Sequence, residues 1–314
     1  MSSVLKKITL FAGPAIFLFL QFLGGPEGLS ENAFSVLCVT IWMALWWVTE
    51  AVPIAVTALL PIVLFPLTGA IDIGTTTESY GHKYVFLYLG GFILAAAIER
   101  WGLHKRIALN IINLIGSNIK KIILGFMLAT AFLSMWISNT ATSVMMLPIG
   151  TAIIAQLKDN PKTVENETEI FGKALMLAIA YSASIGGIAT LIGTPPNLVL
   201  AGIVEELYGI EISFSKWIVL GLPVSALVLF LCYQYLTSRA FDFKQKEFPG
   251  GKQEIRRLLK QLGKMRASEK RVMIIFIITA FCWISRSFLL QKLFPAIDDT
   301  IIAMAAAVLL FLVP

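Results

Sequence analysis

Long apolar segments, separated by short polar ones, run along the whole chain. About 20 apolar residues in a helix cross the roughly 30 Å of a bilayer's hydrocarbon. Segments close to that length are predicted as membrane spans at 8–23, 34–49, 54–69, 84–99, 217–238, 272–290 and 300–314, together with two interrupted segments at 122–157 and 173–208. This pattern predicts an all-α polytopic membrane protein.

The first interruption is Ser138-Asn139-Thr140, in the middle of segment 122–157. Its arms, 122–137 and 141–157, would be roughly 24–26 Å long as helices, slightly shorter than the hydrocarbon is thick. Two short full spans and a re-entrant hairpin both return the chain to the same side. We favour the hairpin, because three residues would otherwise form an unusually tight outer loop. At membrane depth, polar groups of such a tip must be satisfied by protein, a water-filled cavity or a ligand.

The second interruption lies in segment 173–208, between Gly186-Gly187 and Pro195-Pro196. Proline cannot donate a backbone hydrogen bond and disfavours helical geometry at Thr194, so we expect a helix break between about 187 and 195. A broken helix presents carbonyls at one half-helix end and amides at the other. Such ends bind coupling ions and anionic substrates. Hard cations such as Na⁺ take oxygen ligands of the kind found here.

Composition agrees with a membrane protein, since 57% of residues are hydrophobic, 14% are charged and the mean hydropathy is +0.81. Soluble domains carry about 25% charged residues. The net charge of +6 could suggest nucleic-acid binding, but 21 of the 25 Lys and Arg fall on one side of the predicted spans. The remaining four are predicted on or near the outer side: Lys83, Lys216, Arg286 and Lys292. This positive-inside bias predicts a cytoplasmic N-terminus and excludes nucleic acid as the partner.

Two further segments are predicted as helices outside the hydrocarbon. Residues 101–115 combine basic residues with an apolar stripe, which is typical of a helix at the cytoplasmic interface. Residues 243–271 are the most charged stretch, with leucine and isoleucine at helical spacing, and are interpreted as a cytoplasmic connecting helix.

The two interruptions resemble those of a known family. The run Ser134-Met135-Trp136-Ile137-Ser138-Asn139-Thr140-Ala141-Thr142 resembles the hairpin-tip motif of the divalent anion/sodium symporter family, the sodium-coupled dicarboxylate and citrate carriers. Ser184-Ile185-Gly186-Gly187 through Gly193-Thr194-Pro195-Pro196-Asn197 is similar to that family's unwound fifth helix. The motifs occur in the family's order and spacing, and the resemblance covers essentially all 314 residues.

The resemblance implies roles for individual residues. It places Ser134, Ser138, Asn139 and the backbone of Gly187 at a Na⁺ site, and Asn139 and Thr140 against a substrate carboxylate. Thr194 and Asn197 belong to the motif's loop and are assigned to substrate binding. Neither interrupted region places a Lys or Arg beside these residues, so co-bound Na⁺ and helix dipoles would offset the charge of a dianion.

The same resemblance implies an elevator-type inverted-repeat transporter and a homodimer formed through scaffold helices. Residues 1–118 would be scaffold helices and the interfacial helix, 119–240 the first half of the transport domain, 241–271 the connecting helix, and 272–314 the start of the second repeat's scaffold. The expected activity is Na⁺-coupled uptake of succinate, malate or fumarate across the bacterial inner (plasma) membrane.

The family's second hairpin has no counterpart here, because Ser-Asn-Thr occurs once in the sequence. We therefore expect a truncated or incomplete chain that does not transport by itself. Sodium-coupled citrate or sulfate transport and a passive channel stay open as alternatives. The predicted spans contain no paired carboxylates, metal-ligand cluster or nucleophile–base arrangement, so we do not expect an enzyme.

Overall fold

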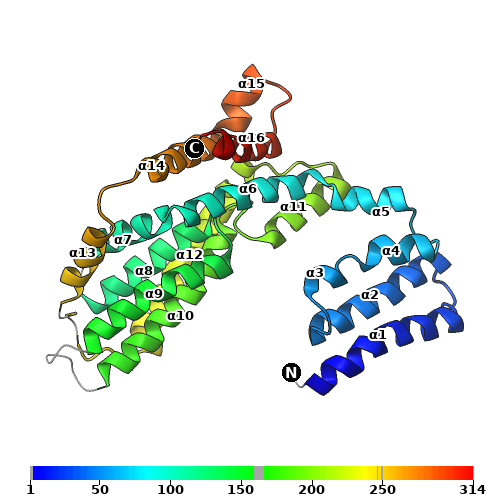
Figure 1. Cartoon of the computed structure of the whole chain (residues 1–314), viewed down its shortest axis with the longest axis horizontal. Coiled ribbons are helices and arrows are strands. Elements are labelled where there is room, and N and C mark those ends of the chain that lie inside the picture. Colours follow the sequence, from blue (N-terminus) through cyan, green and yellow to red (C-terminus); the bar gives the residue numbers. More distant parts are fainter. Residues whose placement is uncertain (1–2, 117, 159–165, 246, 249, 314) are drawn as a thin grey trace. The chain divides into compact units, whose positions relative to one another are not determined.

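The structure is a computed structural model that describes residues 3–116, 118–158, 166–245, 247–248 and 250–313. The chain forms two compact units, residues 1–82 and 83–314. Throughout the described residues the elements are helices, and none of these residues forms a strand, apart from an isolated bridge between Asn118 and Glu247 (Figure 1). The expected all-α class is confirmed.

The first unit is built on two long helices followed by three short ones. Its elements are α1 (Ser3–Leu23), α2 (Glu31–Thr49), α3 (Ile54–Thr57), α4 (Leu60–Leu67) and α5 (Ile73–Tyr80). The helices α1 and α2 pack through aromatic rings, and the indole nitrogen of Trp46 donates to the carbonyl of Thr9 at 3.1 Å. Asp72 caps α5, where its carboxylate accepts from the backbone N–H of Thr75 at 3.0 Å.

The single span predicted at 54–69 is wrong, because the structure divides it into α3 and α4. Pro61 is the second residue of α4, a position that tolerates proline because its N–H would have no helical partner. Inside a continuous helix the same proline would clash with the carbonyl one turn earlier, which explains a break just before it. Pro61 could have indicated this break from the sequence, but the prediction rested on the number of consecutive apolar residues.

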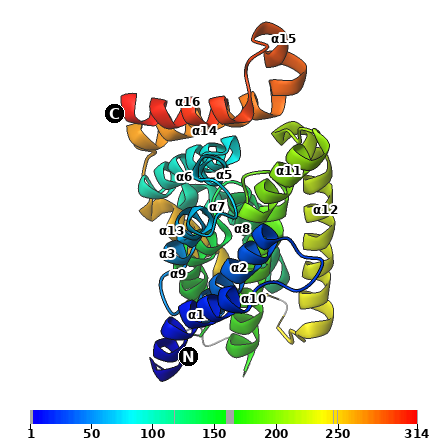
Figure 2. The same cartoon turned by 90° about the vertical axis from the view of Figure 1, so that its right-hand side faces the viewer.

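The second unit contains the two interrupted segments. Its elements are α6 (Lys83–Arg100), α7 (Leu103–Ile115), α8 (Ile119–Ser134), α9 (Asn139–Lys158), α10 (Glu167–Ile188), α11 (Pro195–Tyr208), α12 (Phe214–Tyr235), the π-helix η1 (Leu236–Ala240), α13 (Gly251–Gln261), α14 (Ala267–Ser285), the π-helix η2 (Arg286–Leu290), α15 (Gln291–Leu293) and α16 (Asp299–Leu312). The helices α8, α9 and α10 lie side by side, while α14 and α16 pack together and against α6 (Figure 2).

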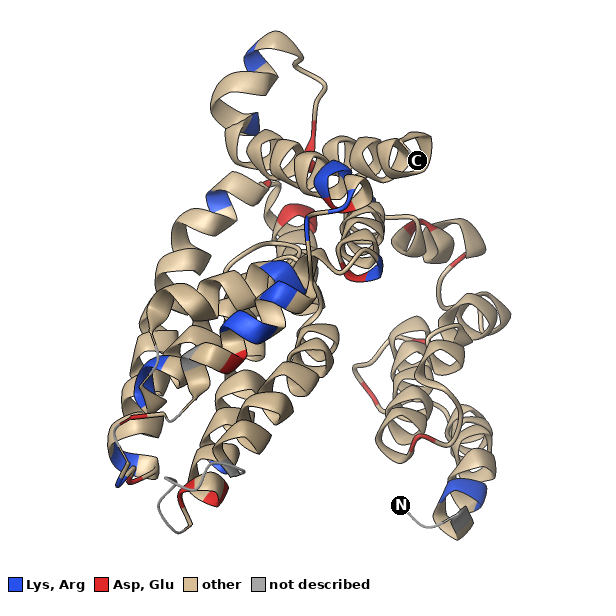
Figure 3. Ribbon diagram, turned by 60° about the vertical axis from the view of Figure 1, so that its left-hand side comes forward, with Lys and Arg blue, Asp and Glu red and all other residues tan. Residues whose placement is uncertain are grey.

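Seven helical segments within the described residues are long and apolar enough to cross a membrane. They are Val4–Leu23, Glu31–Thr49, Ile73–Arg100, Asn139–Leu157, Glu167–Ile188, Phe214–Ala240 and Ala267–Leu293. Most of their length carries no charged side chain (Figure 3). The chain is therefore a polytopic membrane protein, although α16, predicted as a span, has only 14 residues.

The two helices predicted outside the hydrocarbon are present. The interfacial prediction corresponds to α7, which buries one face including Leu103, Ala108 and Ile112, and α13 lies within the predicted connecting helix and packs against α7. His104 sits on the buried face of α7 at 4% exposure, 3.3 Å from the carbonyl of Ile98. Burial lowers the pKa of His104, which favours the neutral ring at this corner.

Candidate functional site

The break between α8 and α9 begins three residues before the predicted polar tip, and only Ser138 of Ser138-Asn139-Thr140 belongs to it. The helix α8 ends at Ser134 and α9 begins at Asn139, so residues 135–138 are the only non-helical link. Ser138 caps the start of α9, because its Oγ accepts from the backbone N–H of Ala141 at 3.3 Å. Its backbone carbonyl accepts from the N–H of Thr142 at 2.9 Å. A break in this segment is confirmed, but the arm predicted to run to residue 137 ends at Ser134, and the second arm, Asn139–Leu157, is long and apolar enough to span a membrane. The re-entrant hairpin and its membrane depth stay predictions.

The break in the second interrupted segment is also where the sequence places it. The helix α10 ends at Ile188 and α11 begins at Pro195. The last carbonyls of a helix lack intrahelical partners, and here side chains supply donors. Four side chains donate to backbone carbonyls at this end of α10 and in the following loop: Ser134 to Ala183 at 2.6 Å, Ser225 to Ile185 at 2.8 Å, Trp217 to Ile188 at 2.9 Å, and Asn197 to Gly187 at 2.9 Å and to Thr190 at 2.8 Å.

The hairpin tip and the broken helix lie in direct contact. A Cβ built on Gly187 would lie 2.4 Å from Oδ1 of Asn139, so only glycine permits this approach. One residue earlier, a Cβ on Gly186 would lie 2.3 Å from the carbonyl oxygen of Ala131 in α8. The hydroxyl of Thr190 donates to the carbonyl of Met135, which ties the loop after α10 to the hairpin link.

Four predicted site residues therefore converge around one point. The hydroxyl of Ser134, which is completely buried, lies 2.8 Å from Oδ1 of Asn139, so its single proton is shared between that oxygen and the carbonyl of Ala183. Asn139 faces Gly187, and the carbonyl of Gly187 accepts from Asn197, which is 7% exposed. A hydroxyl, an amide oxygen and backbone carbonyls are thus gathered in one place.

Three other predicted residues lie at the edge of this group. Ser138 is half-buried and already caps α9, while Thr140, one residue into the helix after Asn139, is exposed. Thr194 is half-buried at the N-cap of α11, and its hydroxyl makes no capping hydrogen bond. Their assignment to Na⁺ or substrate remains a prediction.

The electrostatics of the site come from helix ends. The helix α9 starts at Asn139 and α11 starts two residues before Asn197, and both side chains lie beside Gly187. Each helix N-terminus acts as roughly +0.5 of an elementary charge. The C-terminal ends of α8 and α10 meet them here and act as roughly −0.5 each, so the four helix ends nearly cancel. Since all seven predicted site residues are also uncharged, the site offers oxygen ligands and backbone amides without a net charge of its own.

Sequence reasoning did not identify three residues that build the site. Thr190, Trp217 and Ser225 bond backbone carbonyls of the hairpin link or of α10. Thr190 stands inside the predicted break, and Ser225 is a polar residue within an otherwise apolar span, a signal of the same kind as Ser138-Asn139-Thr140. Trp217 offers no comparable signal, because it starts a span where tryptophan is common.

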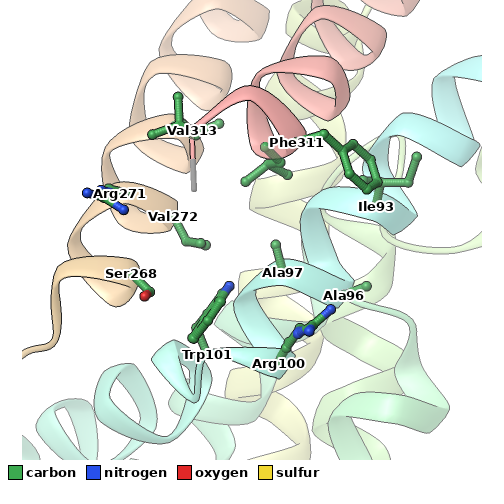
Figure 4. Close-up of a pocket in the computed structure, with 12 residues that line it drawn as sticks. Ile93, Ala96, Ala97, Arg100, Trp101, Ser268, Arg271, Val272, Phe311 and Val313 are labelled. Atoms are coloured by element: carbon green, nitrogen blue, oxygen red, sulfur yellow. The ribbon is translucent and has the colours of Figure 1, made fainter.

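A separate pocket of about 390 Å³ lies between α6, α14 and α16 (Figure 4). Its lining is largely apolar, with Arg100, Trp101, Ser268 and Arg271 contributed by the ends of α6 and α14. None of the seven predicted site residues lines it. The pocket is therefore distinct from the group around Gly187.

Comparison with known proteins identifies the family of this chain. The family model described as the sodium:sulfate symporter transmembrane region matches residues 5–314. The chain belongs to the sodium:sulfate symporter family.

Two relatives within this symporter family carry the name sodium-dependent dicarboxylate transporter SdcS. The protein from Staphylococcus saprophyticus is 45% identical over 313 residues, and that from Staphylococcus aureus strain USA300 is 47% identical over 313 residues. Each alignment covers 98% of this chain and 60% of the relative, so the chain spans about 60% of the length of these relatives. Both names describe transporters, in agreement with the expectation that the chain is not an enzyme.

Proposed function

We propose that the polypeptide carrying this sequence couples Na⁺ entry to uptake of a dicarboxylate dianion such as succinate, malate or fumarate. The observation that carries the proposal is the convergence of Ser134, Asn139 and Asn197 on Gly187 at the starts of two helices. The names of the two relatives support both the ion and the substrate class.

Charge balance explains why an ion is needed. The N-termini of α9 and α11 and the C-termini of α8 and α10 meet here with partial charges that nearly cancel, whereas a dicarboxylate brings −2. Bound Na⁺ is therefore the main source of positive charge for the dianion. At about 4 Å and an effective dielectric constant near 20, its attraction for a carboxylate is about 4 kcal/mol, or roughly 10³-fold in affinity.

The donor set fits Na⁺ rather than a softer metal. Ser134, Ser138, Asn139 and the carbonyl of Gly187 offer only oxygen ligands, as hard cations prefer. Asn139, Thr140 and Thr194 then face the substrate from the two helix ends, and Asn197 contributes to substrate binding by holding the loop, since its amide nitrogen donates to Gly187 and Thr190. In this proposal the amide of Asn139 serves both ligands, because its Oδ1 can bind the ion while its N–H groups reach a carboxylate.

For the mechanism we keep the elevator arrangement implied by the resemblance. Residues 119–240 form half of a transport domain, while 1–118 and 272–314 belong to a dimeric scaffold, with 241–271 connecting them. The N-terminus lies in the cytoplasm of a bacterial cell, and the positive-inside bias supports this orientation.

Equilibrium binding of succinate in detergent tests the site, measured on the full-length polypeptide, that is, the whole protein that carries this sequence. Succinate is expected to bind roughly 10³-fold more tightly in NaCl than in choline chloride. Equal affinity in the two salts would contradict coupling. The family's description favours sulfate as the second candidate, so Na⁺-dependent binding of sulfate without succinate would move the substrate to that dianion.

A further inference from the structure

A buried ion pair lies outside the site, where α14 passes through η2 toward α16. The side chain of Arg286 is 3% exposed, and its guanidinium lies 2.9 Å from Oδ2 of Asp299 and 2.5 Å from Oε1 of Glu211. Burying charges costs desolvation free energy that their attraction barely repays, so such a pair is weak evidence for stability. A role in fixing a particular arrangement is the better-supported use of buried ions.

Asp299 holds two aromatic residues from different helices. Its Oδ2 accepts from the backbone N–H of Phe214, the first residue of α12, at 2.7 Å. Its backbone carbonyl accepts from the indole nitrogen of Trp283 in α14 at 3.0 Å. The two rings stack on each other with centroids 5.1 Å apart and planes at 18°.

These rings enclose Trp136, which belongs to the link between α8 and α9. Trp136 stacks on Phe214 at 5.9 Å and on Trp283 at 6.4 Å, and Phe276 meets it edge-on at 4.9 Å. Trp136 is 9% exposed and stands two residues from both Ser134 and Ser138. A ring so enclosed restricts the backbone of a four-residue link.

We propose that Arg286 and Asp299 are positioning residues for the hairpin tip. The carboxylate of Asp299, paired with Arg286, holds the backbone of Phe214, and its backbone carbonyl holds Trp283. The two rings hold Trp136, which fixes the link that sets the placement of Ser134 and Asn139 in the state that the structure describes. In the elevator arrangement this contact opens when the transport domain slides against α14 and α16. Residues near the end of this sequence thereby order a site carried by α8 and α10. Only the ion-binding part of the test rests on the proposed function.

The test compares Asp299→Asn with Glu269→Gln in the full-length polypeptide. Glu269 also lies on α14, where its carboxylate pairs with Arg106 at 3.2 Å and accepts from the backbone N–H of Arg266 at 2.7 Å. Hydrogen–deuterium exchange of residues 134–142 is expected to quicken at least tenfold in Asp299→Asn and to stay unchanged in Glu269→Gln. Phe214→Leu leaves both carboxylates intact and should also quicken exchange there.

The binding arm measures Na⁺ affinity in the same proteins. Asp299→Asn is expected to weaken Na⁺ binding at least tenfold, while Glu269→Gln keeps the wild-type value. If residues 134–142 of Asp299→Asn exchange at the wild-type rate, the inference is overturned, even where the variant has altered thermal stability or an altered transport rate. If Asp299→Asn does not fold, Phe214→Leu decides by the same exchange readout. If the wild type binds no Na⁺, the proposed function fails, and the exchange experiment still decides this inference.

Discussion

Replacing Gly187 with alanine tests whether the close approach of the hairpin tip and α10 forms an ion site. The new Cβ would lie 2.4 Å from Oδ1 of Asn139 and 3.1 Å from its Cγ and Nδ2. Ordinary contacts begin near 3.4 Å, so the amide must move by about 1 Å. That movement breaks the 2.8 Å bond from Ser134 to Asn139.

The expected effects on folding and on binding differ. Overpacking costs about 1–3 kcal/mol, and the gain in helix propensity from glycine to alanine returns about 1 kcal/mol. The net loss in the free energy of unfolding should therefore be about 0–2 kcal/mol. Displacing one oxygen ligand from a cation loses about 1.5–3 kcal/mol, so Na⁺ affinity should fall roughly 10- to 100-fold.

The assay is Na⁺ titration of succinate binding to Gly187→Ala in the full-length polypeptide, with thermal unfolding measured in parallel. Gly172→Ala is the matched control, because it makes the same change on the same helix. There the Cβ would meet Ile154 at ordinary distances, the nearest atom being 3.6 Å away. If Gly187→Ala binds Na⁺ with wild-type affinity, the assignment of Asn139 and Gly187 to an ion site is wrong.

Three further substitutions test the site and one local element. Asn139→Ala should abolish Na⁺-dependent succinate binding, and unchanged affinity and sodium dependence would contradict its assignment. Asn197→Asp removes a donor from two carbonyls at 2.8–2.9 Å, so calorimetry should show a loss of at least about 2 kcal/mol in unfolding free energy; a wild-type melting curve would refute this. Asp72→Ala should speed amide exchange at residues 73–76 about fivefold, because the cap acceptor is lost, whereas Asp72→Asn keeps an acceptor and should not. Hydrogen bonds from Thr75 lower the pKa of Asp72, so its carboxylate stays ionised and caps α5 from neutral pH through the usual carboxylate range. The cap is lost only as the pH falls through the lowered pKa. If the amides of residues 73–76 lose their protection from exchange near pH 6, after correction for intrinsic exchange rates, this prediction is wrong.

The two breaks could be predicted because each carries a local chemical signal. Ser138-Asn139-Thr140 places polar groups where lipid excludes them, and Pro195-Pro196 removes backbone donors. The position of the second break follows from the two prolines, whereas the first lies at residues 135–138, slightly before the centre of the polar run that signals it. Pro61 is the same kind of signal for the break between α3 and α4, but it stands in a uniformly apolar stretch that was predicted as one span.

The partners across the fold could not be predicted in this way. Ser225 reaches the carbonyl of Ile185 from 40 residues away, a pairing that depends on how α10 and α12 pack. The expected placement of Arg286 on or near the outer side stays a prediction, but nothing in the sequence indicated that its side chain is buried, at 3% exposure, beside Asp299 and Glu211. The distribution of Lys and Arg along the sequence predicts on which side of the membrane a residue lies. Whether an arginine can be buried depends on which acidic side chains the folded chain places beside it.

Uptake of radiolabelled succinate into proteoliposomes containing the full-length polypeptide tests the central claim most directly. An inward Na⁺ gradient should drive succinate accumulation above the external concentration, and replacing Na⁺ with choline should abolish it. Succinate entry that only equilibrates across the membrane and proceeds equally without Na⁺ would contradict coupled transport and favour a passive channel.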